Sequence, residues 1–243
     1  MSDRIALAWS SGKDSAWALY QLQQNPQYEV VVLLTTLNAE FNRVTSHGVS
    51  ARLLTRQSAA AGLPLYRVLL PWPCSNEAYE SAMAEACVKL ISTFQVTHIA
   101  FGDLYLEDVR SYREYSLQGS GLSPLFPLWG STTATLAREM VDSGLQAHLS
   151  CVDTSRLPAY LAGRNFDHDF LDALPANIDP CGENGEFHTF VSAAPSFSET
   201  IIVAMNGVVE KDGFAFADLI AADTVPDDKT STDDHTEIDS SLA

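Results

Sequence analysis

The chain has 243 residues, a hydrophobic fraction of 46% and a formal net charge of −17, from 14 basic and 31 acidic side chains. A chain of this length has room for one or two domains and can bury a core without disulfides or metals. The excess of acidic residues argues against proteins that bind nucleic acids or anionic membranes, because phosphate binding requires clustered Lys and Arg. We therefore expect a globular protein that does not have nucleic acid or a membrane as its partner.

The cysteines and the N-terminal segment give a second set of exclusions. The four cysteines form no C-x-x-C pair, which argues against a zinc knuckle and a dithiol motif. The apolar run at residues 5–9 is too short for a signal peptide, and no run approaches the 18 residues of a membrane span. We expect a cytoplasmic protein with reduced thiols.

The first half of the chain alternates strand-like and helix-like segments. Short apolar or β-branched runs, typical of strands buried on both faces, cover residues 5–9, 30–37, 65–70 and 96–101. Helical patterns follow the first three runs, at residues 15–24, 49–61 and 75–94. Strands that alternate with helices predict right-handed crossovers and a parallel sheet.

The pattern changes near residue 122, where Pro and Gly residues interrupt it. A helix is predicted at 132–143, a Gly-rich loop at 179–186, and strands at 145–152, 187–191, 200–205 and 214–221. Asn206-Gly207 has the composition of a hairpin turn. We expect an α/β protein with a Rossmann-like parallel sheet at 1–122 and a smaller α+β domain at 123–222. The tail at 223–243 has seven acidic residues and one basic residue, and we predict that it is disordered.

A short polar segment, Ser10-Ser11-Gly12-Lys13-Asp14-Ser15, lies between the first predicted strand and the first predicted helix. Backbone N–H groups at the start of a helix bind anions, and a glycine lets the main chain approach a ligand closely. The spacing fits neither G-x-x-x-x-G-K-[ST] nor G-x-G-x-x-G. We interpret the segment as a phosphate-binding loop, the alternative being an ordinary turn of small residues.

Charged side chains follow the fourth predicted strand. Asp103 lies at its carboxyl end, where open α/β sheets bind ligands, and could hold Mg²⁺ or position a substrate; the alternative is a turn or helix-cap aspartate. Arg110 and Arg113 share a face if their segment is helical. They could clamp an anionic group, or they could form salt bridges with Glu107 and Glu114.

The second polar cluster is the segment DPCGENGEFHT at residues 179–189. Glu183 and Glu186 are three residues apart and each follows a glycine, and His188 and Thr189 come next, at the start of a predicted strand. Such a loop can present two carboxylates to a cation, an amine or ammonia, and the alternative is an acidic turn. His188 could assist proton transfer or could be an ordinary strand histidine.

These segments together resemble those of a known family. The loop at 10–15 is similar to the PP-loop S-G-G-x-D-S of the ATP pyrophosphatases, with Ser11 in place of the first glycine. This loop, Gly102-Asp103, the segment PLFPLW at 124–129 and the motif at 182–189 occur in the order found in the diphthine–ammonia ligase family. That family's late motif reads G-E-G-G-E-[YF]-x-T, and Asn184 replaces a glycine of it.

The resemblance implies an adenine nucleotide α-hydrolase fold and a ligase that uses ATP and Mg²⁺. Such an enzyme adenylates a substrate carboxylate, releases pyrophosphate and amidates the product with ammonia. The implied acceptor is a carboxylate on a small molecule or on a protein, and the family includes bacterial members of unsettled substrate.

The resemblance also implies roles for individual residues. The residues implied to bind ATP are Ser10, Ser11, Gly12, Lys13, Ser15 and His47. His47 would lie near the adenine or ribose, and the alternative is an ordinary loop histidine. The implied catalytic residues are Lys13, Asp14, Asp103, Glu183 and Glu186, with Asp14 and Asp103 also as Mg²⁺ ligands. The implied substrate contacts are Arg110, Arg113, Glu183, Glu186, His188 and Thr189.

Two other functions are compatible with the same loop. A PP-loop RNA-modifying enzyme is opposed by the acidic composition, and the absence of C-x-x-C argues against the thiolating subset of such enzymes. An ATP-binding sensor without turnover is opposed by the presence of Lys13 and both glutamates. The oligomeric state is open, with a homodimer among the alternatives.

Overall fold

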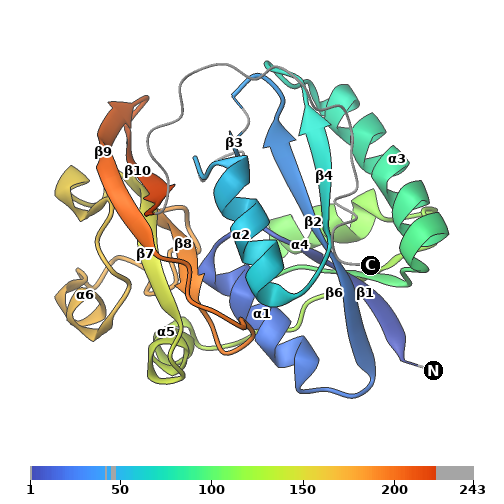
Figure 1. The fold of residues 1–243 in the computed structure, drawn as a ribbon, viewed down its shortest axis with the longest axis horizontal. Coiled ribbons are helices and arrows are strands. Elements are labelled where there is room, and N and C mark those ends of the chain that lie inside the picture. Colours follow the sequence, from blue (N-terminus) through green and yellow to red (C-terminus); the bar gives the residue numbers. More distant parts are fainter. Residues whose placement is uncertain (1, 42, 45–47, 223–243) are drawn as a thin grey trace.

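The computed structural model describes residues 2–41, 43–44 and 48–222, so His47 and the expected acidic tail at 223–243 lie outside the described residues. The described chain forms two β-sheets with helices packed around them (Figure 1). The predicted α/β class, with a largely parallel first sheet and a smaller second sheet, is confirmed. The division at residue 122 stays a prediction, because the two sheets share one hydrophobic core.

Sheet A is built from the first half of the chain. Its parallel strands run in the spatial order β4-β2-β1-β5-β6. In chain order they are β1 (Asp3–Ala8), β2 (Tyr28–Asn38), β4 (Leu65–Leu70), β5 (His98–Ala100) and β6 (Ser123–Leu125). A two-residue strand, β3 (Arg43–Val44), pairs antiparallel with the end of β2. The strand order therefore reverses between β1 and β5, which are neighbours in the sheet but not in the chain.

Alternate side chains of sheet A face two different cores. Ile5 and Leu7 of β1 pack with residues of α1 (Lys13–Gln23) and α2 (Ala51–Ala61), whereas Ala6 packs in the cluster that contains residues of α3 (Asn76–Phe94). Figure 1 shows α1 and α2 on the side of sheet A that faces the second sheet, and α3 on the other side. Burial on both faces explains why these strands are almost continuously apolar.

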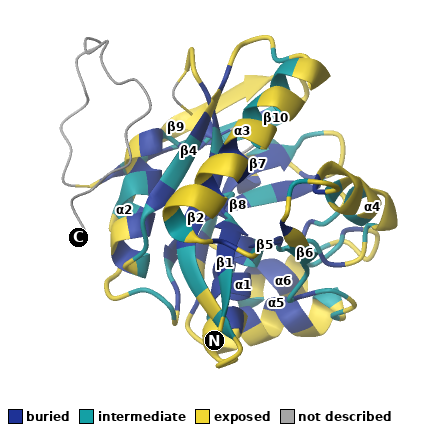
Figure 2. Ribbon diagram, turned by 90° about the vertical axis from the view of Figure 1, so that its right-hand side faces the viewer, coloured by how far each residue is buried: buried dark blue, intermediate teal, exposed yellow. Residues whose placement is uncertain are grey.

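Local signals set the ends of the helices. The hydroxyls of Ser50 and Ser75 cap α2 and α3, accepting the N–H of Leu53 at 3.4 Å and of Ala78 at 3.2 Å. Gly62 ends α2 in the left-handed conformation, with φ +66°. The helix α4 (Glu107–Ser116) has no buried residue and lies on the outside of the molecule (Figure 2).

Sheet B is antiparallel, in the order β8-β7-β10-β9. Its strands are β7 (Gln146–Asp153), β8 (Phe187–Ala193), β9 (Val203–Lys211) and β10 (Phe214–Ala221). The helical elements beside it are α5 (Thr133–Asp142), η1 (Ala159–Leu161) and α6 (His168–Ala173). The outer strand β9 is largely exposed, whereas alternate residues of β10 are buried (Figure 2).

The hairpin of sheet B turns at a different dipeptide from the predicted one. Asn206-Gly207 lies inside β9, where the pairing register with β10 shifts and forms a bulge. The turn is at Asp212-Gly213, whose positive φ angles of +54° and +82° suit a two-residue hairpin. The prediction of the turn at Asn206 was wrong because both dipeptides carry the turn signal, and pairing with β10 continues past the first.

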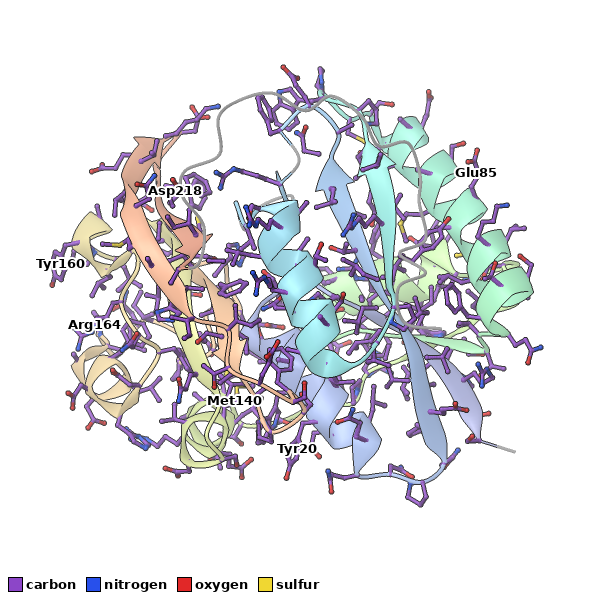
Figure 3. All side chains as sticks on the ribbon, in the orientation of Figure 1. Tyr20, Glu85, Met140, Tyr160, Arg164 and Asp218 are labelled. Atoms are coloured by element: carbon purple, nitrogen blue, oxygen red, sulfur yellow. The ribbon has the colours of Figure 1, made fainter. Side chains whose placement is uncertain are left out.

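Side chains join the two sheets into one body. Arg43 of β3 and Asp218 of β10 form an ion pair at 3.1 Å, and Figure 3 shows Asp218 on the side of sheet B that faces α2. Met140 of α5 is fully buried in the core that includes residues of both sheets (Figure 3). Among the described residues, no helix is both long and apolar enough to cross a membrane.

Candidate active site

A cavity of about 400 Å³ opens at the carboxyl ends of β1 and β5, where the strand order of sheet A reverses. Open α/β sheets bind ligands at this position, because the loops that leave two neighbouring strands diverge there. The cavity is lined by the PP-loop (residues 10–15), by Gly102 and Asp103 after β5, and by part of the glutamate loop (residues 179–186). The structure thus brings together three segments that are widely separated in the sequence.

The PP-loop adopts a backbone conformation that side chains rarely take. Ser11 has φ +73°, in the left-handed region, at the position where the motif usually carries glycine. Its carbonyl oxygen accepts the N–H of Val191 on β8 at 3.0 Å and the side-chain amide of Gln57 at 3.0 Å. These two bonds fix the strained residue from outside the loop.

Gln57 was not predicted as a site residue. It is fully buried in α2, and its amide nitrogen donates to the carbonyl oxygens of Ser11 at 3.0 Å and Val191 at 2.7 Å. Its amide oxygen accepts the indole N–H of Trp9 at 2.9 Å. Only the presence of a glutamine on the buried face of a predicted helix could have drawn attention to it.

Two glycines allow the segments around the cavity to approach closely. A Cβ on Gly12 would lie 3.3 Å from the carbonyl oxygen of Thr189, and one on Gly102 would lie 3.0 Å from the backbone carbon of Asp14. Gly12 precedes the first residue of α1, so the helix N-terminus is at the cavity wall. A helix N-terminus at the wall of a cavity is a common place for phosphate to bind.

The serines of the PP-loop connect its two ends. The Ser15 hydroxyl donates to the Gly12 carbonyl at 2.8 Å and lies 3.4 Å from the Ser10 hydroxyl, which also accepts the Gly12 N–H at 3.3 Å. Ser10 and Ser15 line the cavity. Ser11 is fully buried, and its hydroxyl has no hydrogen-bond partner among the described residues.

Lys13 links the PP-loop to the glutamate loop. Its buried ammonium group donates to both carboxylate oxygens of Asp14, at 3.0 and 2.9 Å, and to the carbonyl oxygen of Cys181. It also lies over the rings of Phe166 and Phe187, 5.7 and 5.5 Å from their centres. Burial alone would lower the pKa of Lys13, but the neighbouring Asp14 raises it above its ordinary value. The lysine therefore stays charged although it is almost wholly removed from water.

Glu183 is the carboxylate of the glutamate loop that reaches the cavity. Its Oε1 accepts the backbone N–H of Leu104, next to Asp103, at 2.8 Å. Burial raises the pKa of Glu183 to about 7, and Asp14 and Asp103 add to this effect. A carboxyl group with such a pKa can exchange a proton near neutral pH.

Glu186 occupies a different place from the predicted one. Its fully buried carboxylate accepts the N–H groups of Asp179 at 3.2 Å and Asn184 at 3.0 Å, and it lies 3.3 Å from the guanidinium of Arg156. It does not line the cavity. The structure does not bring Glu186 to the substrate side as expected, because the carboxylate is the hydrogen-bonding centre of its own loop.

The two arginines of α4 also separate. Arg113 lines the cavity, with its Nε 3.4 Å from Asp103 and its guanidinium 4.9 Å from the centre of the Phe101 ring. Arg110 instead forms an ion pair with Glu114 at 2.8 Å and stacks on Phe126 and Trp129, and it does not line the cavity. Of the two arginines, only Arg113 is in position to contact a ligand in the cavity. Arg110 instead forms the salt bridge with Glu114 that the sequence offered as the alternative role.

Three residues in or next to the glutamate loop complete the wall. Thr189 accepts the backbone N–H of Lys13 at 3.0 Å, which anchors β8 to the start of α1. His188 also lines the cavity, and burial lowers its pKa to about 4, so the imidazole is neutral near pH 7. Burial raises the pKa of the Cys181 thiol to about 12, which keeps it protonated.

The described residues contain no group of three or more His, Cys, Asp or Glu side chains that could hold a metal ion. Asp14 and Asp103 both line the cavity, but they are engaged by Lys13 and Arg113. A protein-only magnesium site is therefore not built here. Mg²⁺ commonly binds through one or two carboxylates together with substrate phosphates, and Asp103 fits that mode.

Comparison with known proteins places these features in a family. Residues 3–124 match the family model of the diphthamide synthase N-terminal domain, and residues 132–217 match that of the diphthamide synthase C-terminal domain. The chain is 27% identical over 237 residues to the diphthine–ammonia ligase of Homo sapiens and 28% identical over 236 residues to that of Bos taurus, with 88% of each chain covered. It is 26% identical over 219 residues to the diphthine–ammonia ligase of Schizosaccharomyces pombe, covering 83% of this chain and 36% of that protein. Since the first model alone spans half of the sequence and the second covers most of sheet B, the chain belongs to the diphthamide synthase family.

Proposed function

We propose that the protein is an ATP-dependent ligase that activates a carboxylate as an acyl-adenylate and converts it to an amide with ammonia. One observation carries the proposal: the PP-loop, Asp103 and Glu183 line a single cavity at the strand-order reversal of sheet A. The names of the relatives, diphthine–ammonia ligases, support the same reaction class. The acceptor is a carboxylate on a small molecule or a protein.

In the first step the PP-loop binds the phosphates of ATP. The backbone at Gly12 and the hydroxyls of Ser10 and Ser15 line the cavity at the N-terminus of α1, where phosphate binding is favourable. Lys13 adds a fixed positive charge at the same wall. An acceptor carboxylate oxygen attacks the α-phosphorus, the bond from this phosphorus to the bridging oxygen breaks, and pyrophosphate leaves.

The cavity needs a counter-ion for ATP, because its own charges nearly cancel. Lys13 is paired with Asp14 and Arg113 with Asp103, while Glu183 adds a further carboxyl group. Mg²⁺ bound with the nucleotide would neutralise phosphate charge, and Asp103 is the carboxylate we propose beside it. This chain would then position the nucleotide rather than hold the metal by itself.

In the second step Glu183 accepts a proton from ammonium. Its pKa of about 7 leaves a useful fraction of carboxylate at neutral pH, and consumption of the ammonia in the following step draws the proton transfer forward. The ammonia that is released attacks the acyl carbon, AMP leaves with the electron pair of the broken acyl–phosphate bond, and the new amide nitrogen gives up its extra proton to solvent. We propose no substrate contact for Glu186, because its carboxylate is bonded within the loop.

The nucleotide product tests the reaction. Protein, Mg-ATP, ammonium and a panel of carboxylic acids are incubated, and the products are separated by anion-exchange chromatography. We expect AMP and pyrophosphate in equal amounts. ADP and phosphate would contradict acyl-adenylate formation, and nucleotide binding without any turnover would indicate a sensor.

A further inference from the structure

We propose that a second cavity, between α3 and α4, binds the acceptor, and that the acceptor is a carboxylic acid with an aromatic or extended apolar body. This inference rests on the proposed function, because it assigns the acid that the ligase would activate. The second cavity has a volume of about 640 Å³, larger than the PP-loop cavity. We call it the acceptor cavity.

The acceptor cavity adjoins the PP-loop cavity. Four residues, Tyr79, Met83, Phe101 and Arg113, line both of them. Phe101 and Arg113 flank the position where β5 ends, next to Asp103. In this arrangement the acidic end of the ligand lies at the shared residues, beside the phosphate side, while its body stays between the helices.

The lining of the acceptor cavity suits an apolar body with one acidic end. Among the described lining residues, Arg113 is the only cationic one and Glu80 the only acidic one. The others are uncharged, and many of them are aromatic or aliphatic. Tyr112, Tyr115 and Val88 at its edge are 43%, 70% and 65% exposed. A cavity whose edge carries several exposed apolar side chains is typical of a binding site.

Arg113 is held at the junction of the two cavities. Its Nε lies 3.4 Å from Asp103, its guanidinium stacks on Phe101 at 4.9 Å, and its interaction with the Tyr79 hydroxyl opposes the rise in that group's pKa caused by burial. A guanidinium carries five N–H donors, so a second carboxylate can bind beside Asp103. An acid bound there would present its carboxylate toward the PP-loop.

The position of Glu183 agrees with this arrangement. Its Oε1 is fixed by the Leu104 N–H immediately after Asp103, and Asp103 contacts Arg113. The acid, the nucleotide and the proton acceptor would then meet around one strand end. The apolar walls of the acceptor cavity select the body of the acid and keep water away from the reactive carbonyl.

The test measures binding of 4-phenylbutyrate to the full chain by saturation-transfer NMR, with 4-phenylbutyramide as the neutral analogue. Ala84→Trp fills the acceptor cavity from the exposed surface of α3, and Arg113→Gln removes its cation. The matched controls are Glu85→Trp, one residue further along α3 and outside the lining (Figure 3), and Arg138→Gln on the exposed side of α5. Binding of a fluorescent ATP analogue is measured on every variant.

We expect the acid to bind at least about tenfold more tightly than the amide, and both cavity variants to weaken acid binding by about tenfold or more. The two controls should match the unaltered chain, and Ala84→Trp should retain ATP-analogue binding. Absence of acid binding, equal binding of acid and amide, or unchanged binding in Ala84→Trp would overturn the proposal. If the acid binds in this way but no AMP forms with any acid, the proposed ligase reaction fails and the cavity assignment stands.

Discussion

The PP-loop and the glutamate loop reach the same cavity by different means. The PP-loop is shaped from outside: Ser11 is held in its left-handed conformation by Gln57 and Val191, which come from α2 and β8. The glutamate loop is shaped from inside, around the buried carboxylate of Glu186. A loop held by its neighbours depends on the packing of both sheets, whereas a loop built on its own side chain depends on one residue.

The two glutamates show what this difference means for function. Glu183 and Glu186 are three residues apart and chemically identical, yet one faces the cavity and the other is the centre of the loop. Their spacing in sequence gives no hint of this division. It arises with the turns of the backbone at Gly182, before Glu183, and at Gly185, before Glu186, whose φ angles are +67° and +81°.

The largest expected effect comes from breaking the contact between the two loops. Lys13→Met removes the ammonium that joins Asp14 to the Cys181 carbonyl, and leaves Asp14 without its cation. We expect loss of AMP formation and a fall of about 3 kcal/mol in the free energy of unfolding, since removing one partner of a buried pair is strongly destabilising. Urea unfolding measures the change.

The double variant Lys13→Met/Asp14→Asn provides the control for this prediction. It removes both charges, so it should be more stable than Lys13→Met alone if the pair is coupled. Equal stability of the single and double variants would show that Lys13 acts through its phenylalanine and carbonyl contacts rather than through Asp14.

The next effect concerns the chemistry at Glu183. Glu183→Gln should reduce amide formation by about 100-fold, the range of one lost general base. Because the pKa of Glu183 is about 7, the rate of the unaltered protein should rise with pH through that value, and the variant should lose this rise. The pH profile of amide formation measures it, with Glu139→Gln on the exposed surface of α5 as the control. An unchanged profile would assign the proton transfer elsewhere.

The same substitution has a predictable effect on stability. A carboxyl group whose pKa is raised in the folded protein keeps its proton between about pH 4.5 and 7, where the unfolded chain has lost it. The folded state of the unaltered protein should therefore lose stability as the pH rises through this window. Glu183→Gln cannot ionise and should remove that loss, which urea unfolding at several pH values would measure.

The sequence alone was sufficient for those parts that depend on local patterns. Four strands of sheet A, β1, β2, β4 and β5, follow from apolar runs, whereas the short strands β3 and β6 were not predicted. The ends of α2 follow from a serine cap and Gly62, and the PP-loop follows from small residues between a strand and a helix. Gln57 could not be found this way, because its role depends on packing between α2, the PP-loop and β8. The turn of sheet B was misplaced because Asn206-Gly207 and Asp212-Gly213 carry similar local signals.

Charged residues were the hardest to assign from sequence. Arg110 and Arg113 share a helix, but only the second reaches the cavity, since the first packs on Phe126 and Trp129. A one-dimensional pattern predicts that two side chains point the same way, but not which neighbour each will find. The same limit applies to Glu183 and Glu186, where hydrogen-bond partners rather than spacing decide the roles.

The smallest expected effect therefore tests the internal design of the glutamate loop. Glu186→Gln replaces one acceptor oxygen by an NH₂ group that faces N–H donors of Asp179 or Asn184, and it weakens the contact with Arg156. One buried donor is then left without an acceptor, so we expect the free energy of unfolding to fall by about 2 kcal/mol. The amide of Asn184 should also exchange its hydrogen faster.

Glu183→Gln, the same change three residues earlier, is the matched control for this loop. Its amide oxygen can still accept the Leu104 N–H and its side chain cannot ionise, so its stability should match that of the unaltered protein near pH 4.5 and exceed it near pH 7, while its activity falls. Glu186→Gln should instead lower the free energy of unfolding. Its activity should fall only to the extent that the altered loop displaces Glu183. A Glu186→Gln variant with unaltered stability and no amide formation would assign this carboxylate to the chemistry, and the two glutamates would then act as a pair.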